Sequence, residues 1–503
     1  MVKITQIYPP LNNQQQNRSS TPACINQSMA LVCSKRTIFI FFFPFRTIHF
    51  SSAASPPFSS SSDDASTITT AISILKHHRS KSRWTHLRTL FPSGFTPSQF
   101  SQITLQLRNN PHLSLTFFQF TIQHSLCHHT LLSYASIIHT LARSRQKSQT
   151  LTLIRSAIHK FDDPNNNVLL FETLVKTYRM FDSAPFVFDL LIKACVQSKR
   201  VEQAIEIVRM LRCKGINPLI STCNSLILCV CKYSGSIAGY EIYCELFGDK
   251  VVAPGVKIVV PNVHTYNIIM HALYTDGLIE NLEQVWSDMI VNNCVPSEYS
   301  YSVLMAAYCD NGRMEDAIRV WEEMGNNGLE HDVMAYNTMI GGFCEAGDIH
   351  KAEEFVKEMG LSEKKSSSVT YEHLIKGYCK IGDVDSAMLL YKDMCRKGFT
   401  PIGFIVDLLI KELCVSNKVS EALMVSRFAV ENNVVVNGGS YEFLIKGLCS
   451  EGRMEESMKL QAEMLGKGYE PNSEIYAAFI SGYEKEGNFE LAGKLRTELL
   501  RMQ

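Results

Sequence analysis

Five cysteines recur along the chain at intervals of 35 residues: Cys309, Cys344, Cys379, Cys414 and Cys449. Regularly spaced thiols could bind zinc or form disulfide bridges. If each interval is one packed helical unit, equivalent cysteines lie about 8 to 10 Å or more apart, beyond the limit of about 7 Å between the Cα atoms of a disulfide. One thiol per unit also cannot supply the four ligands of a structural zinc site. We therefore expect these cysteines to be core residues that mark a repeat.

Other residues that could support chemistry stand alone. The segment HSLCHH, residues 124–129, has no second pair of ligands beside it, and Cys229 and Cys231 are one residue apart rather than the two typical of zinc sites. Neither a GxxxxGK[ST] phosphate loop nor the H-x-E and P-C-x-x-C motifs of zinc deaminases occurs. The sequence therefore predicts no enzyme activity, no metal site and no cofactor.

Length and composition indicate several domains or one extended array. The chain has 503 residues, of which 46% are hydrophobic and 19% charged. Its 49 basic and 49 acidic residues cancel, so a polyanionic partner would need a local patch. Sixteen cysteines are too sparse for a disulfide scaffold and favour a reducing compartment. The most apolar run, residues 38–45, is too short to span a bilayer.

The N-terminal 62 residues form a separate compositional region. They contain five Lys or Arg residues, many serines and no acidic residue, which is typical of an organelle transit peptide. A disordered tail is the alternative, and a secretory signal fits less well because positive charge flanks the apolar run on both sides. Translation starts at Met1 or at Met29, which opens a second segment of this kind. Residues 63–130 are expected to form a linker and an N-terminal helical cap.

Four further residue types share the 35-residue period. In residues 333–367 they are Tyr336, Gly347, Ala352 and Met359. The tyrosine begins an apolar stripe at helical spacing, and the glycine is suited to end that helix. The alanine and the methionine lie on the apolar face of a second helix. Each unit is thus predicted to be an antiparallel helical hairpin, and hairpins must stack because one alone cannot bury its apolar face.

The segments MAYNTMIGGFCEAGDIHKAEEFVKEM (334–359) and HTYNIIMHALYTDGLIENLEQVWSDM (264–289) closely resemble the pentatricopeptide repeat, a 35-residue helical hairpin common in plant organelle proteins. The resemblance implies an all-α, right-handed superhelical solenoid of about nine to ten units in residues 131–503. It is closest to the P class, which has pure 35-residue repeats and no C-terminal editing domain. Full units are expected to begin at Pro185, Ile220, Val263, Glu298, Val333, Ser368, Gly403 and Gly438, with a weaker unit near Leu131 and a truncated one at Ser473.

The resemblance also implies a function, because the family binds single-stranded RNA at roughly one base per repeat. The fifth and the last residue of a unit would read the base. The readable pairs are Asn224 with Asn262, Asn267 with Ser297, Ser302 with Asp332, and Asn337 with Ser367. From the 5′ side they would favour a pyrimidine, cytosine, guanine and cytosine. Lysines that follow the cysteine column, Lys232, Lys380 and Lys485, would contact phosphate.

Other units depart from this pattern. Acidic residues hold the fifth position at Asp189, Glu372, Asp407 and Glu442, and apolar residues hold the last position at Leu219 and Ile402. Because a carboxylate repels phosphate, RNA contact is expected to be confined to the middle of the array. The alternative function is a protein-binding helical-repeat scaffold without RNA readout, and the C-terminal units are the candidate surface for a protein partner.

The presequence and the resemblance together predict an organelle protein. The arginines and aromatic residues of RTIFIFFFPFRTIHFSS favour the mitochondrion, with the chloroplast as the alternative. There a monomer without a membrane span would support the stability, processing, splicing or translation of a transcript by occupying a single-stranded segment. Occupancy of this kind requires no catalysis by the protein.

Overall fold

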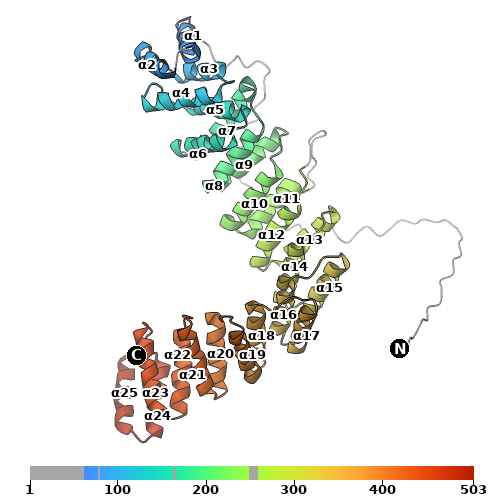
Figure 1. Ribbon diagram of the computed structural model, residues 1–503, viewed down its shortest axis with the longest axis vertical. Helices are drawn as coiled ribbons and strands as arrows, with labels where there is room; N and C mark the ends of the chain where they lie inside the picture. Colours follow the sequence, from blue (N-terminus) through green and yellow to red (C-terminus); the bar gives the residue numbers. More distant parts are fainter. Residues whose placement is uncertain (1–61, 78–79, 162–165, 249–258, 503) are drawn as a thin grey trace, which may run out of the picture. The chain divides into compact units, whose positions relative to one another are not determined.

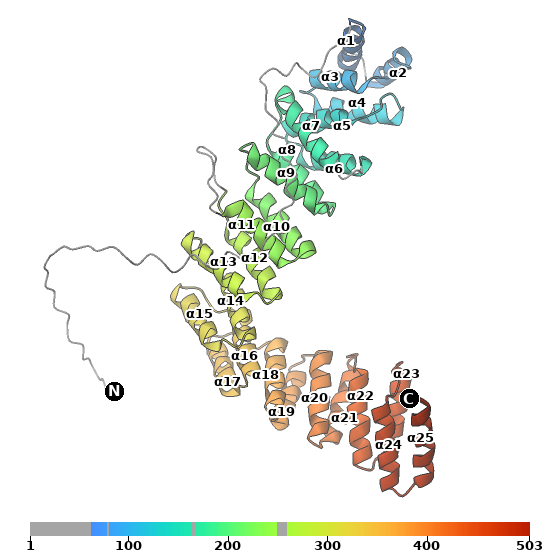
Figure 2. The same ribbon diagram turned by 180° about the vertical axis from the view of Figure 1, so that it is seen from behind.

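The computed structural model describes residues 62–77, 80–161, 166–248 and 259–502. These residues form 25 α-helices, and apart from one isolated bridge between Phe95 and Cys127 they contain no β-structure. The helices follow one another as hairpins along the chain (Figures 1 and 2). The predicted all-α stack of hairpins is confirmed. No helix in the described ranges is long and apolar enough to cross a membrane, and the predicted targeting segment lies, except for Ser62, outside these ranges.

Residues 186–502, called the array below, form nine hairpins within the described part of the chain. The first helices are α8 (Phe186–Gln197), α10 (Ile220–Ser234), α12 (Val263–Thr275), α14 (Glu298–Asp310), α16 (Val333–Ala346), α18 (Ser368–Lys380), α20 (Gly403–Val415), α22 (Gly438–Ser450) and α24 (Ser473–Lys485). The second helices are α9 (Val201–Cys213), α11 (Ser236–Phe247), α13 (Ile279–Val291), α15 (Met314–Asn326), α17 (Ile349–Leu361), α19 (Val384–Arg396), α21 (Val419–Glu431), α23 (Met454–Gly466) and α25 (Phe489–Met502). From α10 onward, every first helix begins at a residue predicted to start a unit. The last unit, predicted to be shorter than the others, contains both helices.

Most hairpins of the array turn at a residue with left-handed backbone conformation. Gly347, which ends α16, has φ of 81°. Asn417 fills the one gap in the glycine column and has φ of 58°, a conformation that asparagine tolerates better than most residues. The hairpin of α10 and α11 differs, because the single residue Gly235 (φ 92°) connects its helices. The glycine column is therefore explained by the turn geometry that the sequence predicted.

In four units, a tyrosine of the column bonds the first helix to the second helix of the same hairpin. Tyr336 is fully buried, and its hydroxyl donates to Glu358 Oε1 at 3.2 Å. The same bond joins Tyr301 to Glu323 (3.2 Å), Tyr371 to Asp393 (2.7 Å) and Tyr441 to Glu463 (2.8 Å). Because a buried hydroxyl needs a partner, this bond lets a large aromatic residue occupy the core at little cost. In the last unit Tyr476 is only half-buried.

The cysteine column packs between successive first helices. A Cβ placed on Gly342 of α16 would lie 2.5 Å from Sγ of Cys309 in α14, and one on Gly377 of α18 would lie 2.8 Å from Sγ of Cys344. Cys309 and Cys344 therefore occupy space that a glycine in the next unit leaves open. Burial raises the pKa of Cys309 and Cys344 to about 12, so these free thiols are protonated at neutral pH. The predicted core role is confirmed, although Cys414 is only half-buried.

Residues 62–181, called the N-terminal block below, differ from the array in which helices pack on one another. Their helices are α1 (Ser62–His77), α2 (Ser80–Leu90), α3 (Pro97–Gln106), α4 (Pro111–Gln123), α5 (Leu131–Arg143), α6 (Lys147–Lys160) and α7 (Asn166–Phe181). Here α1, α3, α5 and α7 pack on one another in succession, whereas in the array the even-numbered helices do, starting with α6 against α8. The change follows from α7, a single helix that packs mainly on α5. The layer formed by the first helices of the array therefore continues into the N-terminal block only as far as α6, and α1, α3, α5 and α7 form a separate succession.

Candidate nucleic-acid interface

The last residue of most units begins the first helix of the next one. Asn262, Ser297, Asp332 and Ser367 have extended backbone conformations and cap α12, α14, α16 and α18. Each side chain accepts a hydrogen bond from the backbone N–H three residues on, at 2.7 Å between Ala335 N and Asp332 Oδ1. Such caps satisfy N–H groups that have no partner inside the helix. Four of the eight predicted base-reading residues thus also stabilise a helix N-terminus.

Three of the four predicted pairs are joined by hydrogen bonds. Asn337 Nδ2 donates to Ser367 Oγ at 3.2 Å, while its Oδ1 accepts from Thr370 Oγ1 at 2.7 Å. Asn267 is held in the same way by Ser297 (3.2 Å) and Ser300 (2.6 Å), and Asn224 by Asn262 (3.3 Å) and Thr265 (2.7 Å). These bonds fix the direction of each amide. One Nδ2–H and the remaining lone pairs are left for a ligand.

The fourth pair has a different arrangement. Ser302 Oγ donates to Glu298 O in its own helix at 2.9 Å, and Asp332 serves as the cap of α16. Only 5% of Ser302 is exposed, compared with 4% of Asn224 and 9% of Asn337. Each of these fifth residues directly follows the tyrosine column, and its side chain is almost fully buried between neighbouring first helices. A ligand therefore meets the last residues of the units before it reaches the fifth ones.

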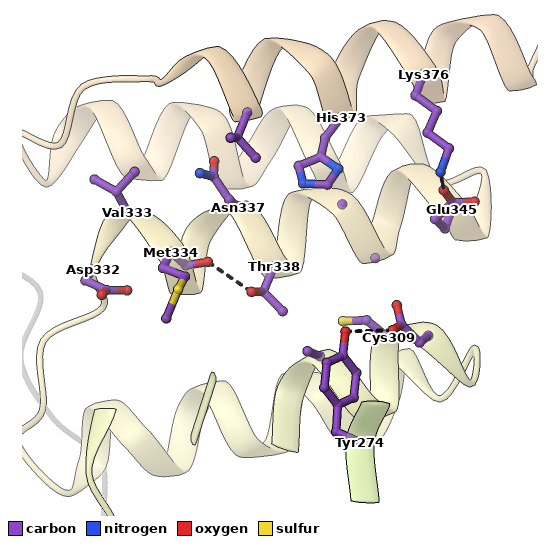
Figure 3. Close-up of a pocket in the computed structure, with 15 residues that line it drawn as sticks. Tyr274, Cys309, Asp332, Val333, Met334, Asn337, Thr338, Glu345, His373 and Lys376 are labelled. Carbon is purple, nitrogen blue, oxygen red and sulfur yellow. Dashed lines mark hydrogen bonds and ion pairs between the residues drawn. The ribbon is translucent and has the colours of Figure 1, made fainter. Parts of the chain in front are cut away.

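Two cavities open at the predicted pairs. One of about 780 Å³ lies among α14, α16 and α18, and its lining includes Asp332, Met334, Asn337, His373 and Lys376 (Figure 3). The other, of about 310 Å³, is lined by Asn224, Asn262, Leu228 and His264. Both combine a few convergent polar groups with apolar walls, which is the usual composition of a ligand site. Four of the eight predicted reading residues, Asn224, Asn262, Asp332 and Asn337, therefore lie at concave places on the first-helix layer.

Family models of the pentatricopeptide repeat match several hairpins of the array. Models described as a PPR repeat match residues 186–216, 299–329, 327–360 and 439–469. A model described as a PPR repeat family matches residues 261–310 and 366–401. The chain contains pentatricopeptide repeats. The 35-residue hairpins described above are its pentatricopeptide units.

Several known proteins are similar to this chain. A pentatricopeptide repeat-containing protein of Arabidopsis thaliana is 50% identical over 230 residues, which cover 44% of this chain and 46% of the relative. A mitochondrial one from the same plant is 26% identical over 212 residues, covering 42% and 37%. The chain thus spans less than half of the length of these relatives. Among solved structures, maize PPR10 is 15% identical with a TM-score of 0.38, and covers 86% of this chain and 78% of its own.

A further column of pentatricopeptide residues at this interface was missed from the sequence. The second residues of four units are large and exposed: Tyr299 (41%), Met334 (48%), Val369 (42%) and Phe404 (59%). They precede the fifth residues by about one helical turn, and Met334 and Val369 line the cavity of Figure 3. Apolar and aromatic faces left in water beside polar pairs can stack against bases. Bulky residues off the core stripe, again at 35-residue spacing, were the signal that could have identified this column.

The predicted phosphate-binding lysines differ in their surroundings. Lys380 Nζ lies 3.2 Å from Glu345 Oε2, and Lys376 pairs with the same carboxylate (Figure 3 shows the second pair). These two lysines hold the pKa of Glu345 below its usual range. Lys232 lies 5.9 Å from the centre of the Tyr233 ring and is exposed, as is Lys485. Lys380 is therefore partly neutralised within the pentatricopeptide units, whereas Lys232 and Lys485 lie open to solvent.

Acidic residues at the fifth position are bonded within the scaffold in three units. Asp407 Oδ1 accepts from Asn437 N at 3.2 Å and from Ser440 Oγ at 2.6 Å. Asp189 Oδ1 accepts from Leu219 N at 2.8 Å, and Glu442 accepts from Asn472 Nδ2 (2.7 Å) and Lys446 (3.0 Å). These bonds occupy acceptor sites of the carboxylates that would otherwise be open on the surface of the first-helix layer. Glu372 differs, because its unit ends in Ile402 and burial raises the pKa of its carboxyl.

Proposed function

We propose that this chain binds single-stranded RNA and selects its sequence through the first-helix layer of residues 220–367. The observation that carries the proposal is the hydrogen-bonded set of Asn224, Asn267 and Asn337 with the last residues of their units. Each amide is held in one orientation and keeps unused donor and acceptor sites, as hydrogen bonding to a base edge requires.

The proposed readout alternates polar and apolar elements along the layer. An asparagine or serine pair would meet the edge of one base, while second-position residues such as Tyr299 and Met334 would contact the faces of neighbouring bases. The family rule then assigns a pyrimidine to Asn224 with Asn262, and cytosine, guanine and cytosine to the next three pairs. The strand would run 5′ to 3′ from the N-terminal side. Maize PPR10, whose structure with an 18-nucleotide RNA element is known, has RNA as its ligand.

The biological outcome we propose is protection or remodelling of an organelle transcript by occupancy. A bound segment is hidden from nucleases and held out of RNA structure, and neither effect needs a reaction catalysed by the protein. Several relatives with 22–26% identity are named as mitochondrial, which supports the mitochondrion, with the chloroplast as the alternative. Assignment to the P class and a monomeric state belong to the same proposal.

Replacing Ser302 by Asn provides the test. Asparagine already occupies the equivalent position in the units on either side, at Asn267 and Asn337, so the change is compatible with the scaffold. Purified wild-type and Ser302→Asn proteins would each select from a randomised RNA pool. We expect one position of the selected sequence to change from a purine to a pyrimidine while the others stay the same.

The matched control is Thr497→Asn. The Thr497 hydroxyl donates to Gly493 O four residues earlier in α25, as Ser302 does in α14, but it lies on a second helix. This variant should select the wild-type sequence. Selection of no common sequence by the wild-type protein, or an unchanged sequence with Ser302→Asn, would reject base reading and favour the protein-binding scaffold.

A further inference from the structure

The neutral net charge of the chain conceals a strong separation of charge. Residues 65–161 contain eleven Lys or Arg residues and nine of the fifteen histidines, and no Asp or Glu. Residues 162–503 contain 33 basic and 47 acidic residues. The cationic stretch coincides with α1 to α6, which carry none of the predicted base-reading pairs.

This separation poses a problem for RNA binding by the array alone. Affinity for RNA depends strongly on neutralising phosphates with lysine and arginine. The part of the chain that carries the reading pairs has an excess of acidic residues, and one of its three predicted phosphate-binding lysines, Lys380, is paired with Glu345. Phosphate contacts elsewhere on the molecule would therefore add affinity that the array's own charge does not favour.

Basic residues of the N-terminal block gather along one edge. Arg108, at the turn between α3 and α4, donates to Met180 O at the end of α7 at 3.1 Å. Arg143, at the end of α5, pairs with Asp182 just after α7. The α3–α4 turn, the α5–α6 turn and the end of α7 therefore lie side by side. The cationic ridge, as it is called below, consists of Arg108, Arg143, Arg145, Lys147 and Arg179.

The ridge presents more positive charge than its own structure uses. Asp182 is its one acidic neighbour in an ion pair among the described residues, and it pairs with Arg143. Arg145, Lys147 and Arg179 are exposed, and no ion pair involves them in the described part of the chain. Arg145 has φ of 59°, at the tip of the α5–α6 turn. These three cations are available to an external anion.

We propose that the cationic ridge binds the phosphodiester backbone of RNA without reading its bases. Charges on successive stacked turns form a row, which fits a linear polyanion. A lipid surface fits less well, because the turn Arg143–Lys147 contains no apolar residue that could insert into a bilayer. The choice of RNA as the occupant rests on the function proposed above. The ridge then supplies electrostatic affinity for a strand whose sequence the array reads.

The test uses the full-length protein with Arg145→Gln and Arg179→Gln combined. Binding to an unstructured RNA oligonucleotide would be followed by fluorescence anisotropy over a series of salt concentrations. Each lost phosphate contact lowers the slope of log affinity against log salt by about 0.7 for single strands, so we expect a decrease of about 1.4 and weaker binding at low salt. The sequence selected from a randomised pool should stay that of the wild-type protein.

The matched control combines Lys357→Gln and Lys392→Gln, two exposed lysines on the second helices α17 and α19. It changes the net charge equally and should leave the slope unchanged. Equal effects of both double variants, no effect of either, or loss of base preference in the ridge variant would overturn the proposal. The proposal would also be overturned if the ridge variant lost binding to phosphatidylserine vesicles while its RNA binding stayed that of the wild-type protein. If Ser302→Asn alters no preference while the ridge variant still lowers the slope, base reading fails and the ridge stands.

Discussion

Two neighbouring units of the array share one scaffold and differ at the places where a base would be read. Residues 333–367 and 368–402 each form a hairpin with a buried tyrosine, Tyr336 or Tyr371, whose hydroxyl bonds to the second helix. The first unit ends in Ser367, which caps α18 and accepts from Asn337. The second ends in Ile402, which provides no side-chain cap for α20.

The comparison shows that a hairpin can form without the predicted reading pair. Ile402 is 51% exposed, and the Glu372 carboxyl of the same unit has a raised pKa because it is half-buried. A missing cap costs about 1 kcal/mol, whereas a buried aromatic side chain such as Tyr371 contributes about 3 to 5 kcal/mol. The unit 368–402 therefore keeps its hairpin without the hydrogen-bonded pair that residues 333–367 have.

The largest effect is expected where the two units meet. A Cβ on Gly377 would lie 2.6 Å from Ile349 Cδ1 and 2.8 Å from Cys344 Cβ, so Gly377→Leu forces α16 and α18 apart. We expect a loss of about 1 to 3 kcal/mol in the free energy of unfolding, measured by denaturant titration. The control is Gly360→Leu in α17, where no atom lies within 4 Å of the added Cβ. Equal stability of the two variants would contradict the packing assigned to this interface.

A smaller effect is expected from giving the second unit the pair that the first one has. Glu372→Asn with Ile402→Ser supplies a cap for α20 and removes a half-buried carboxylate. We expect about 1 kcal/mol of added stability from the cap, and one more specified base in the RNA that the protein selects. Glu372→Asn alone, the control, lacks the cap. If the double variant selects the same RNA as the wild-type protein, a readable pair is not sufficient for base recognition.

The same two units show what a sequence can and cannot predict. The starts of α16 and α18 followed from the 35-residue period, because buried tyrosine, alanine and methionine columns leave little choice of register. The bond from Thr370 to Asn337 could not be predicted, since it joins side chains 33 residues apart on different units. The sequence also did not predict that the stacked helices change from odd-numbered to even-numbered ones near α7. That helix lacks the columns, and a non-glycine residue, Asp182 (φ 50°), follows it.

The smallest expected effect isolates the orientation of one amide. Thr370 Oγ1 donates to Asn337 Oδ1 at 2.7 Å. The residue in the equivalent place relative to Glu372 is Ile405, the third residue of the unit after 368–402, and it has no hydroxyl. Thr370→Val keeps the shape and the bond from Thr370 N to Ser367 Oγ, but it removes this donor and the acceptor of the Ser367 backbone N–H. The loss of stability should be about 0.5 to 1.5 kcal/mol. Base discrimination at the position assigned to Asn337 should fall, because the amide is then held only by its bond to Ser367 Oγ.

Thr222→Val is the matched control for that amide. Thr222 holds the same third position in α10, but the fifth residue of the preceding unit, Asp189, bonds instead to Leu219 N at 2.8 Å. Its replacement should leave the selected RNA unchanged. If Thr370→Val also leaves discrimination intact, the fixed amide is a consequence of helix capping alone, and the exposed second-position residues such as Met334 and Val369 would have to carry selectivity. The two outcomes thus distinguish whether the difference between the units lies in hydrogen bonding or in stacking.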